Sequence, residues 1–181
     1  MTAEFNAVLE FWFEEIDSKL WWTKDISFDD LIRQRFSSLL EQAIAGELAP
    51  WRESAQGSLA EVIVLDQLSR NIYRDDPRSF AQDPQALALA QIAIAKGYDT
   101  QLQDARRSFL YLPFMHSESA LIHEQAVILY ESLDSGDNLN FELRHKSIID
   151  RFGRYPHRNA ILGRESTPAE REFLSQPGSS F

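Results

Sequence analysis

The sequence predicts an all-α protein that forms a single domain over residues 1–181. Apolar side chains recur at helical spacing along almost the whole chain. Helix start and stop residues interrupt this pattern at short intervals, which favours antiparallel packing of neighbouring helices. No run of alternating β-branched residues competes with it, because the best strand candidate, residues 62–66 (VIVLD), lies inside a helical pattern.

The first two helices are defined by apolar stripes and capping residues. Apolar residues at i, i+3 and i+4 spacing predict a helix over residues 2–15. Ser27 is the predicted N-cap of a second helix, whose first turn carries two aspartates that favour the positive end of the helix dipole. Gly46 then supplies a left-handed stop.

Three more helices are expected in the middle of the chain. A third helix is predicted over residues 58–70, with its apolar stripe facing inward. Asp83 followed by Pro84 is typical of an N-cap and a first helical residue, and predicts a fourth helix that ends at a glycine. A short fifth helix over residues 104–110 is expected to end before Pro113, because the residue before a proline disfavours the α conformation.

The C-terminal third predicts the last three helices. Ser117 is the expected N-cap of a sixth helix that continues over residues 120–133 and is closed by the turn SGDN. A seventh helix over residues 140–151 is followed by Gly153 as a left-handed stop. The TPAE run at residues 167–170 is a capping box and predicts a final short helix.

Composition excludes several classes of function. The chain carries 18 Lys and Arg against 28 Asp and Glu, and a net charge of −10 disfavours general binding to nucleic acid or to an anionic membrane surface. Without cysteine there is no disulfide, thiol nucleophile or cysteine zinc site. The N-terminal stretch lacks the positive leading region of a signal peptide, and no apolar run is long enough to span a membrane. We expect a cytoplasmic protein without a cofactor, and the sequence leaves its oligomeric state open.

Basic residues gather in one stretch of this acidic chain. Residues 151–164 (RFGRYPHRNAILGR) hold four arginines. From residue 144 to the C-terminus, seven Lys and Arg stand against four Asp and Glu. Such a concentration indicates either a structural ion-pair cluster or a site for an anion.

Two predicted helix ends share one pattern. Residues 66–74 (DQLSRNIYR) and 150–159 (DRFGRYPHRN) each place an aspartate four residues before an arginine, with a second arginine four residues further on. Asp–Arg pairs at i,i+4 and arginines at helix C-termini are ordinary stabilising features. If the two ends converge, however, their guanidinium groups would hold a carboxylate or phosphate, which arginine binds through two parallel hydrogen bonds.

The four histidines offer acid–base groups rather than a metal site. No two of them lie at i,i+4 on one helix, so we expect no bound metal. His116 lies beside Ser117 and Glu118 near the predicted start of the sixth helix, where exposed amides attract an anion. If a cleft forms there, His116 or Glu118 would act as a general acid or base, and His157 is a further candidate.

Five motifs match one known family in order and spacing. They are FWF at 11–13, W-x-K-D-x-x-F-D at 22–29, LDQLSRNIYR at 65–74, FLYLPFMHSE at 109–118 and RFGRYPHRNAILGRESTPAE at 151–170. With these motifs the chain resembles the family known as domain of unknown function 924. The resemblance implies an all-helical fold of the tetratricopeptide-like superfamily, in which stacked helix pairs leave a concave face. Together with the helices predicted above, we expect about seven to eight antiparallel helices. Since no 34-residue repeat is present, we expect an irregular array. The resemblance implies no activity.

The motif residues are mostly polar and lie at predicted helix ends, so we predict that they surround one pocket. The ligand-binding candidates are Asp66, Arg70, Asn71, Arg74, Arg151, Arg154, Arg158 and Asn159. The catalytic candidates are His116, His157 and Glu118.

Three hypotheses for the function follow from this pocket. The first is a binding module for an anionic small molecule or a peptide carboxylate. The alternative is a small-molecule enzyme with hydrolase-like acid–base chemistry on an acidic or phosphorylated substrate. A second alternative is a structural ion-pair network, with the protein acting through another surface.

Overall fold

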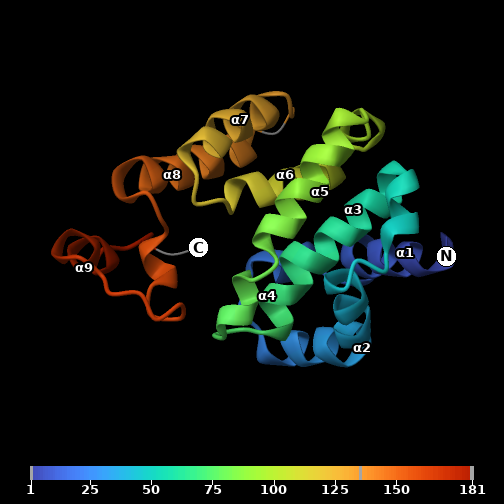
Figure 1. The fold of residues 1–181 in the computed structure, drawn as a ribbon, viewed down its shortest axis with the longest axis horizontal. Coiled ribbons are helices and arrows are strands. Elements are labelled where there is room, and N and C mark those ends of the chain that lie inside the picture. Colours follow the sequence, from blue (N-terminus) through green and yellow to red (C-terminus); the bar gives the residue numbers. More distant parts are fainter. Residues whose placement is uncertain (1, 135, 180–181) are drawn as a thin grey trace.

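The computed structural model describes residues 2–134 and 136–179. Over these residues every regular element is helical and no strand is present, so the predicted all-α fold is confirmed (Figure 1). The α-helices are α1 (Thr2–Glu10), α2 (Ile26–Ile44), α3 (Ala55–Ile63), α4 (Ser69–Ile72), α5 (Asp83–Ala95), α6 (Asp104–Met115), α7 (Ala120–Glu131), α8 (Gly136–Phe152) and α9 (Pro168–Leu174). Short π turns (η1, Phe11–Glu15; η4, Val64–Leu68) and 3-10 turns (η2, Ser18–Trp22; η3, Ala49–Glu53; η5, Pro77–Phe80; η6, Asp99–Gln101; η7, Pro156–Arg158) extend or connect them.

The first two helices follow the predicted pattern except at one cap. α1 continues directly into η1, so residues 2–15 form one continuous helical segment, as predicted. The prediction of Ser27 as N-cap of α2 is wrong, because Asp25 takes that position and its carboxylate accepts the Phe28 N–H at 2.8 Å. A carboxylate caps the free N–H as a hydroxyl would, and its charge also favours the helix dipole. Gly46 is left-handed, with φ +77°, as predicted.

The segment from α3 to α4 is the most buried part of the chain. It begins at Ala55 rather than at residue 58, because Ser54 Oγ accepts the N–H of Gly57 at 3.1 Å and caps the helix earlier. The helix then widens into the π turn η4 and narrows again in α4. A π turn holds an additional residue, so the side chains after it point in directions that a regular helix over residues 58–70 would not give them.

Two predictions around α5 and α6 are wrong. Asp83 is not the N-cap of α5 but lies inside its first turn, and Gln82 is the N-cap. α6 does not end before Pro113 but continues through it to Met115. Although Pro113 has no N–H to donate, the last seven residues of α6 are buried, and packing against α3, α5 and α7 outweighs the missing hydrogen bond.

The start of α7 also differs from the prediction. α7 begins at Ala120, with Ser119 rather than Ser117 at the N-cap. The reason is that the Ser117 carbonyl is bound to His123, while the Glu118 side chain turns away to Arg164.

In the C-terminal part, one predicted helix end and one predicted helix start are confirmed. In the SGDN turn, Ser135 lies outside the described residues and the other three residues form the first turn of α8, which therefore starts before residue 140. Gly153 ends α8 with φ +68°, and the capping box between Thr167 and Glu170 opens α9.

The helices pack as successive neighbours around α3. α1, α5 and α6 contact α3, α2 contacts η4 and α4, and α7 joins α6 to α8 (Figure 1). One large apolar core extends from α1 to α7, and a smaller cluster of Ile148, Ile149 and Tyr155 lies at the end of α8. The tetratricopeptide-like arrangement stays a prediction. Among the described residues, no helix has both the length and the apolar character that a membrane span requires.

Candidate functional site

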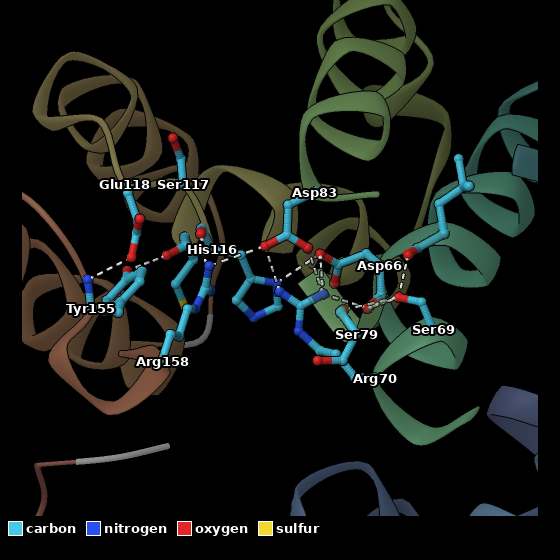
Figure 2. Close-up of polar contacts among 12 residues, drawn as sticks. Asp66, Ser69, Arg70, Ser79, Asp83, His116, Ser117, Glu118, Tyr155 and Arg158 are labelled. Carbon is cyan, nitrogen blue, oxygen red and sulfur yellow. Dashed lines mark hydrogen bonds and ion pairs between the residues drawn. The ribbon is translucent and has the colours of Figure 1, made fainter. Parts of the chain in front are cut away.

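The two arginine-bearing helix ends meet at Asp83 in the first turn of α5 (Figure 2). Arg70 of α4 donates to Asp83 Oδ1 and Oδ2 at 2.9 and 3.0 Å. Arg158 of η7 donates to the same Oδ2 at 3.1 Å. One carboxylate therefore serves two guanidinium groups. We call Asp66, Arg70, Asp83, His116 and Arg158 the polar cluster.

His116, which follows α6, is held by the buried Asp66 of η4. The distance from His116 Nδ1 to Asp66 Oδ1 is 2.7 Å. A carboxylate only accepts, so the ring proton lies on Nδ1 and the lone pair of a neutral ring lies on Nε2. Nε2 has no hydrogen-bond partner among the described residues, and the His116 side chain is 16% exposed.

Burial and charge keep Asp66 ionised and His116 neutral. Burial by itself would raise the pKa of Asp66, but Arg70 and His116 together hold that pKa well below its ordinary value. Burial lowers the pKa of His116, and the positive charge of Arg70 lowers it further against the opposing effect of Asp66. At neutral pH the pair is therefore an aspartate that orients a neutral imidazole.

Arg158 is a buried cation whose hydrogen bonds are incomplete. Its side chain is 7% exposed, and Nη2 donates to the His116 carbonyl at 3.1 Å. The rings of Phe80 and Tyr155 each lie 4.6 Å from its guanidinium carbon. Nε is buried and has no hydrogen-bond partner among the described residues. Burial and the charge of Arg70 lower the pKa of Arg158, so its partners compensate its charge only in part.

Residues 115–118, which we call the strap, carry His116 from α6 to α7. Each of the four residues is bound by a side chain or amide from later in the sequence. The contacts are Tyr155 Oη to Met115 O (2.5 Å), Arg158 Nη2 to His116 O (3.1 Å), His123 Nε2 to Ser117 O (2.9 Å), and Tyr155 N to Glu118 Oε1 (2.8 Å) with Arg164 Nη1 to Glu118 Oε2 (2.7 Å).

Other predicted site residues lie outside the polar cluster. Asn71 and Arg74 turn toward α2, where both donate to Asp29. Asn159 donates to Ser166 at 3.0 Å and accepts from Arg164 at 2.9 Å. These three residues therefore bind the chain to itself.

The arginines at the end of α8 also separate from the cluster. The expected Asp150–Arg154 pair is wrong, because Asp150 binds Lys146 while Arg154 donates to Glu170 at 2.7 Å. Arg151 is exposed and lies 4.6 Å from the Phe152 ring.

Glu118 and His157 lie beside the polar cluster. The pKa of Glu118 is lowered, since its hydrogen bonds with Arg164 and the Tyr155 amide outweigh burial. His157 lies against the Tyr155 ring with centroids 5.4 Å apart. Burial, with the charge of Arg158, lowers the pKa of His157 to about 4, so this ring is neutral at pH 7.

Sequence reasoning missed Asp83 as a site residue. Its position before Pro84 has a sufficient local explanation as a helix start, and nothing in the sequence marks it as the partner of two distant arginines. Arg164 was visible only as one member of the basic stretch, whereas its bidentate pair with Glu118 depends on the tertiary fold.

Surface hollows of about 590 and 460 Å³ lie along α8 and between α5 and α7, and neither is lined by a residue of the polar cluster. Among the described residues, no group of three or more His, Asp and Glu side chains is arranged to hold a metal ion.

The model of a bacterial protein family of unknown function, DUF924, matches residues 8–178. The chain belongs to this family. The solved structure of ATU0120 from Agrobacterium tumefaciens, a protein of unknown function, is similar to this DUF924 chain with a TM-score of 0.91 and 38% sequence identity. The similarity covers 96% of this chain and 97% of that one. None of the curated proteins matches the chain.

Proposed function

We propose that the polar cluster binds the carboxylate or phosphate group of a small molecule. The observation that carries the proposal is the buried Arg158, whose Nε–H has no hydrogen-bond partner among the described residues. An unsatisfied buried donor on a charged group is costly, and an anionic acceptor would remove that cost.

The charges of the cluster favour an anion at this position. Arg158 shares Asp83 with Arg70, while Asp66 is occupied by His116 and Arg70. After burial, the charge of Arg70 is a cause that lowers the pKa of His116, and the charges of Arg158 and Arg70 are among the causes that lower the pKa of His157. An anion next to Arg158 would add negative charge where these groups experience excess positive charge.

Titration with inorganic phosphate, followed by NMR, tests this proposal. Arg158→Lys keeps the charge but removes the Nε–H and the fork, so its affinity for phosphate should fall at least about tenfold. The matched control is Arg151→Lys, an exposed arginine of the same segment, which should stay within about twofold.

A second measurement guards against failure of the variant to fold. In the unmodified protein, phosphate should shift the Arg158 Nε–H and the His116 ring signals together. If neither signal moves, or if both variants bind phosphate as the parent does, the cluster is a structural ion-pair network and the proposal is wrong.

The Asp66–His116 pair favours a second candidate, an enzyme that acts on the bound molecule. Asp66 fixes the Nδ1–H tautomer, so the neutral ring presents Nε2 as a proton acceptor with no competing partner among the described residues. His116 would accept a proton from water or a hydroxyl group next to the anion and return it to the leaving group.

Substituting the two members of this pair separates enzyme from binding module. With p-nitrophenyl phosphate and p-nitrophenyl acetate as probes, His116→Gln and Asp66→Asn should lower turnover about a hundredfold or more while phosphate affinity stays within a few-fold. Unchanged turnover in His116→Gln would rule out the acid–base role and leave the binding module.

A further inference from the structure

A second histidine–carboxylate pair lies behind the strap and is completely buried. His123 of α7 and Glu142 of α8 are both 0% exposed, and His123 Nδ1 lies 2.6 Å from Glu142 Oε1. The other carboxylate oxygen, Oε2, has no hydrogen-bond partner among the described residues. A carboxylate anion with one buried and unpaired oxygen is strongly disfavoured.

The partners of His123 Nε2 determine where its ring carries a proton. Nε2 lies 2.9 Å from the Ser117 carbonyl, which can only accept, so Nε2 must carry a hydrogen. The Tyr155 hydroxyl, 3.2 Å from Nε2, donates its own hydrogen to Met115 O and is therefore also an acceptor for His123.

With Nε2 protonated, the short contact between Nδ1 and Oε1 needs a proton of its own. If Glu142 were an anion and the ring neutral, a lone pair on Nδ1 would oppose a carboxylate oxygen at 2.6 Å. The contact is attractive only when one proton lies between the two atoms. Burial also raises the pKa of Glu142, against the opposing effect of His123.

We infer that the buried His123–Glu142 pair retains one proton at and above neutral pH, and that this proton sets the position of the strap that bears His116. When the proton leaves to solvent base, the neutral ring takes the Nδ1–H tautomer and donates to the Glu142 anion. Nε2 then opposes the Ser117 carbonyl and attracts the Tyr155 hydroxyl hydrogen away from Met115. Two of the four strap residues thereby lose their anchors. The inference does not require that the polar cluster bind a ligand.

The titratable groups around the His123–Glu142 pair keep their protonation state as pH rises above neutrality, so a change there is assigned to the pair. On α8, burial lowers the pKa of His145 to about 3, and Lys146 pairs with Asp150 at the surface. Burial raises the pKa of Tyr130 on α7 and of Tyr155 far above neutrality. On the strap, His116 and Glu118 both have lowered pKa values and keep their charge state as pH rises.

The folding equilibrium should report the retained proton. Above about pH 6.5 an unfolded imidazole and carboxylate hold no proton at this contact, whereas the folded pair holds one. The folding equilibrium constant of the unmodified protein should therefore fall up to about tenfold per pH unit above neutrality, until the folded pair releases its proton. Glu142→Gln places an N–H donor opposite Nδ1, copies the protonated state and should remove this fall.

The matched control is Glu124→Gln, which removes the same charge from an exposed position next to His123. Urea unfolding between about pH 6.5 and 8.5 should give parallel profiles for this variant and the parent, and a flatter profile for Glu142→Gln. Parallel profiles for all three proteins would overturn the retained proton.

NMR of the histidine ring nitrogens in the unmodified protein tests the proposal even if Glu142→Gln fails to fold. Nε2 of His123 should stay protonated through pH 7, and the His116 ring signals should shift at the pH where the pair releases its proton. An unprotonated Nε2 at pH 7 would contradict the retained proton. A His116 signal that does not respond to the release would overturn the link to the strap.

Discussion

At the scale of single residues, most of the charged groups that mark this sequence bind one another. Glu118 accepts from Arg164, Asp29 from Arg74 and Glu170 from Arg154, each through two hydrogen bonds. Asp83 differs from these carboxylates because it serves two arginines at once. Its loss therefore has a larger consequence than the loss of an ordinary ion pair.

We predict that Asp83→Asn lowers the free energy of unfolding by about 3 kcal/mol, because two largely buried guanidinium groups would lose a shared counter-charge. Asp150→Asn, which breaks the exposed pair with Lys146, should change it by no more than about 0.5 kcal/mol. Urea denaturation measures both. Equal effects of the two substitutions would mean that Arg70 and Arg158 do not depend on Asp83.

The sequence predicted which residue types form the site better than which residues meet. Asp66 and Arg70 form the expected i,i+4 pair, because four residues bring two side chains onto one helix face. The same rule failed for Arg154, since Glu170 offered a carboxylate that local spacing cannot reveal. The bond from His116 to Asp66 likewise spans 50 positions and depends on how α6 packs.

At the scale of elements, burial overrides local signals in two places. Pro113 does not stop α6, whose last seven residues are buried. Gly57 lies in the first turn of α3, although a glycine weakens a helix, because η3 passes directly above it. Sequence patterns predicted the helices and the left-handed glycines that end two of them, Gly46 and Gly153. They could not predict the close approach between the backbones of α3 and η3.

We predict that Gly57→Ala lowers the free energy of unfolding by about 2–3 kcal/mol. Its Cβ would lie 2.1 Å from the Trp51 carbonyl oxygen, so the backbone of η3 must move. Gly46→Ala is the control, because its Cβ meets nothing within 4 Å and only the left-handed backbone opposes it, at about 1 kcal/mol. Urea unfolding followed by tryptophan fluorescence should give this order, and the reverse order would contradict the close approach.

At the scale of the whole molecule, the C-terminal third anchors the strap by polar contacts rather than by a large apolar interface. Its own apolar cluster is small, whereas Tyr155, Arg158 and Arg164 each bind the strap. Several of the buried groups in this third are histidines, so the protonation of the folded and unfolded chains differs.

We predict that the protein loses stability as pH falls from about 6.5 to 4.5. The pKa of buried His145 is about 3 in the folded chain against 6.5 ordinarily, so in this range the unfolded chain binds the additional proton. The contribution of His145 to stability is complete only above pH 6.5, and it falls by roughly 2–3 kcal/mol by pH 4.5. His157, with a pKa of about 4, acts in the same direction.

Urea midpoints at pH 6.5, 5.5 and 4.5 measure this loss. His145→Gln should reduce the slope of the free energy of unfolding against pH by the amount that corresponds to one bound proton, since a glutamine does not titrate. A parent profile that stays level down to pH 4.5 would mean that these histidines are charged in the folded protein.

The π turn η4 makes the number of residues in this part of the chain as important as their identity. Removing Val64 or Leu65 would restore a regular helix and rotate everything after it by about 100°. Asp66 and Arg70 would then turn together away from His116 and Asp83, even though every side chain of the cluster was still encoded. In related chains that keep this site, insertions and deletions should therefore fall in the surface turns and never between Ile63 and Ser69.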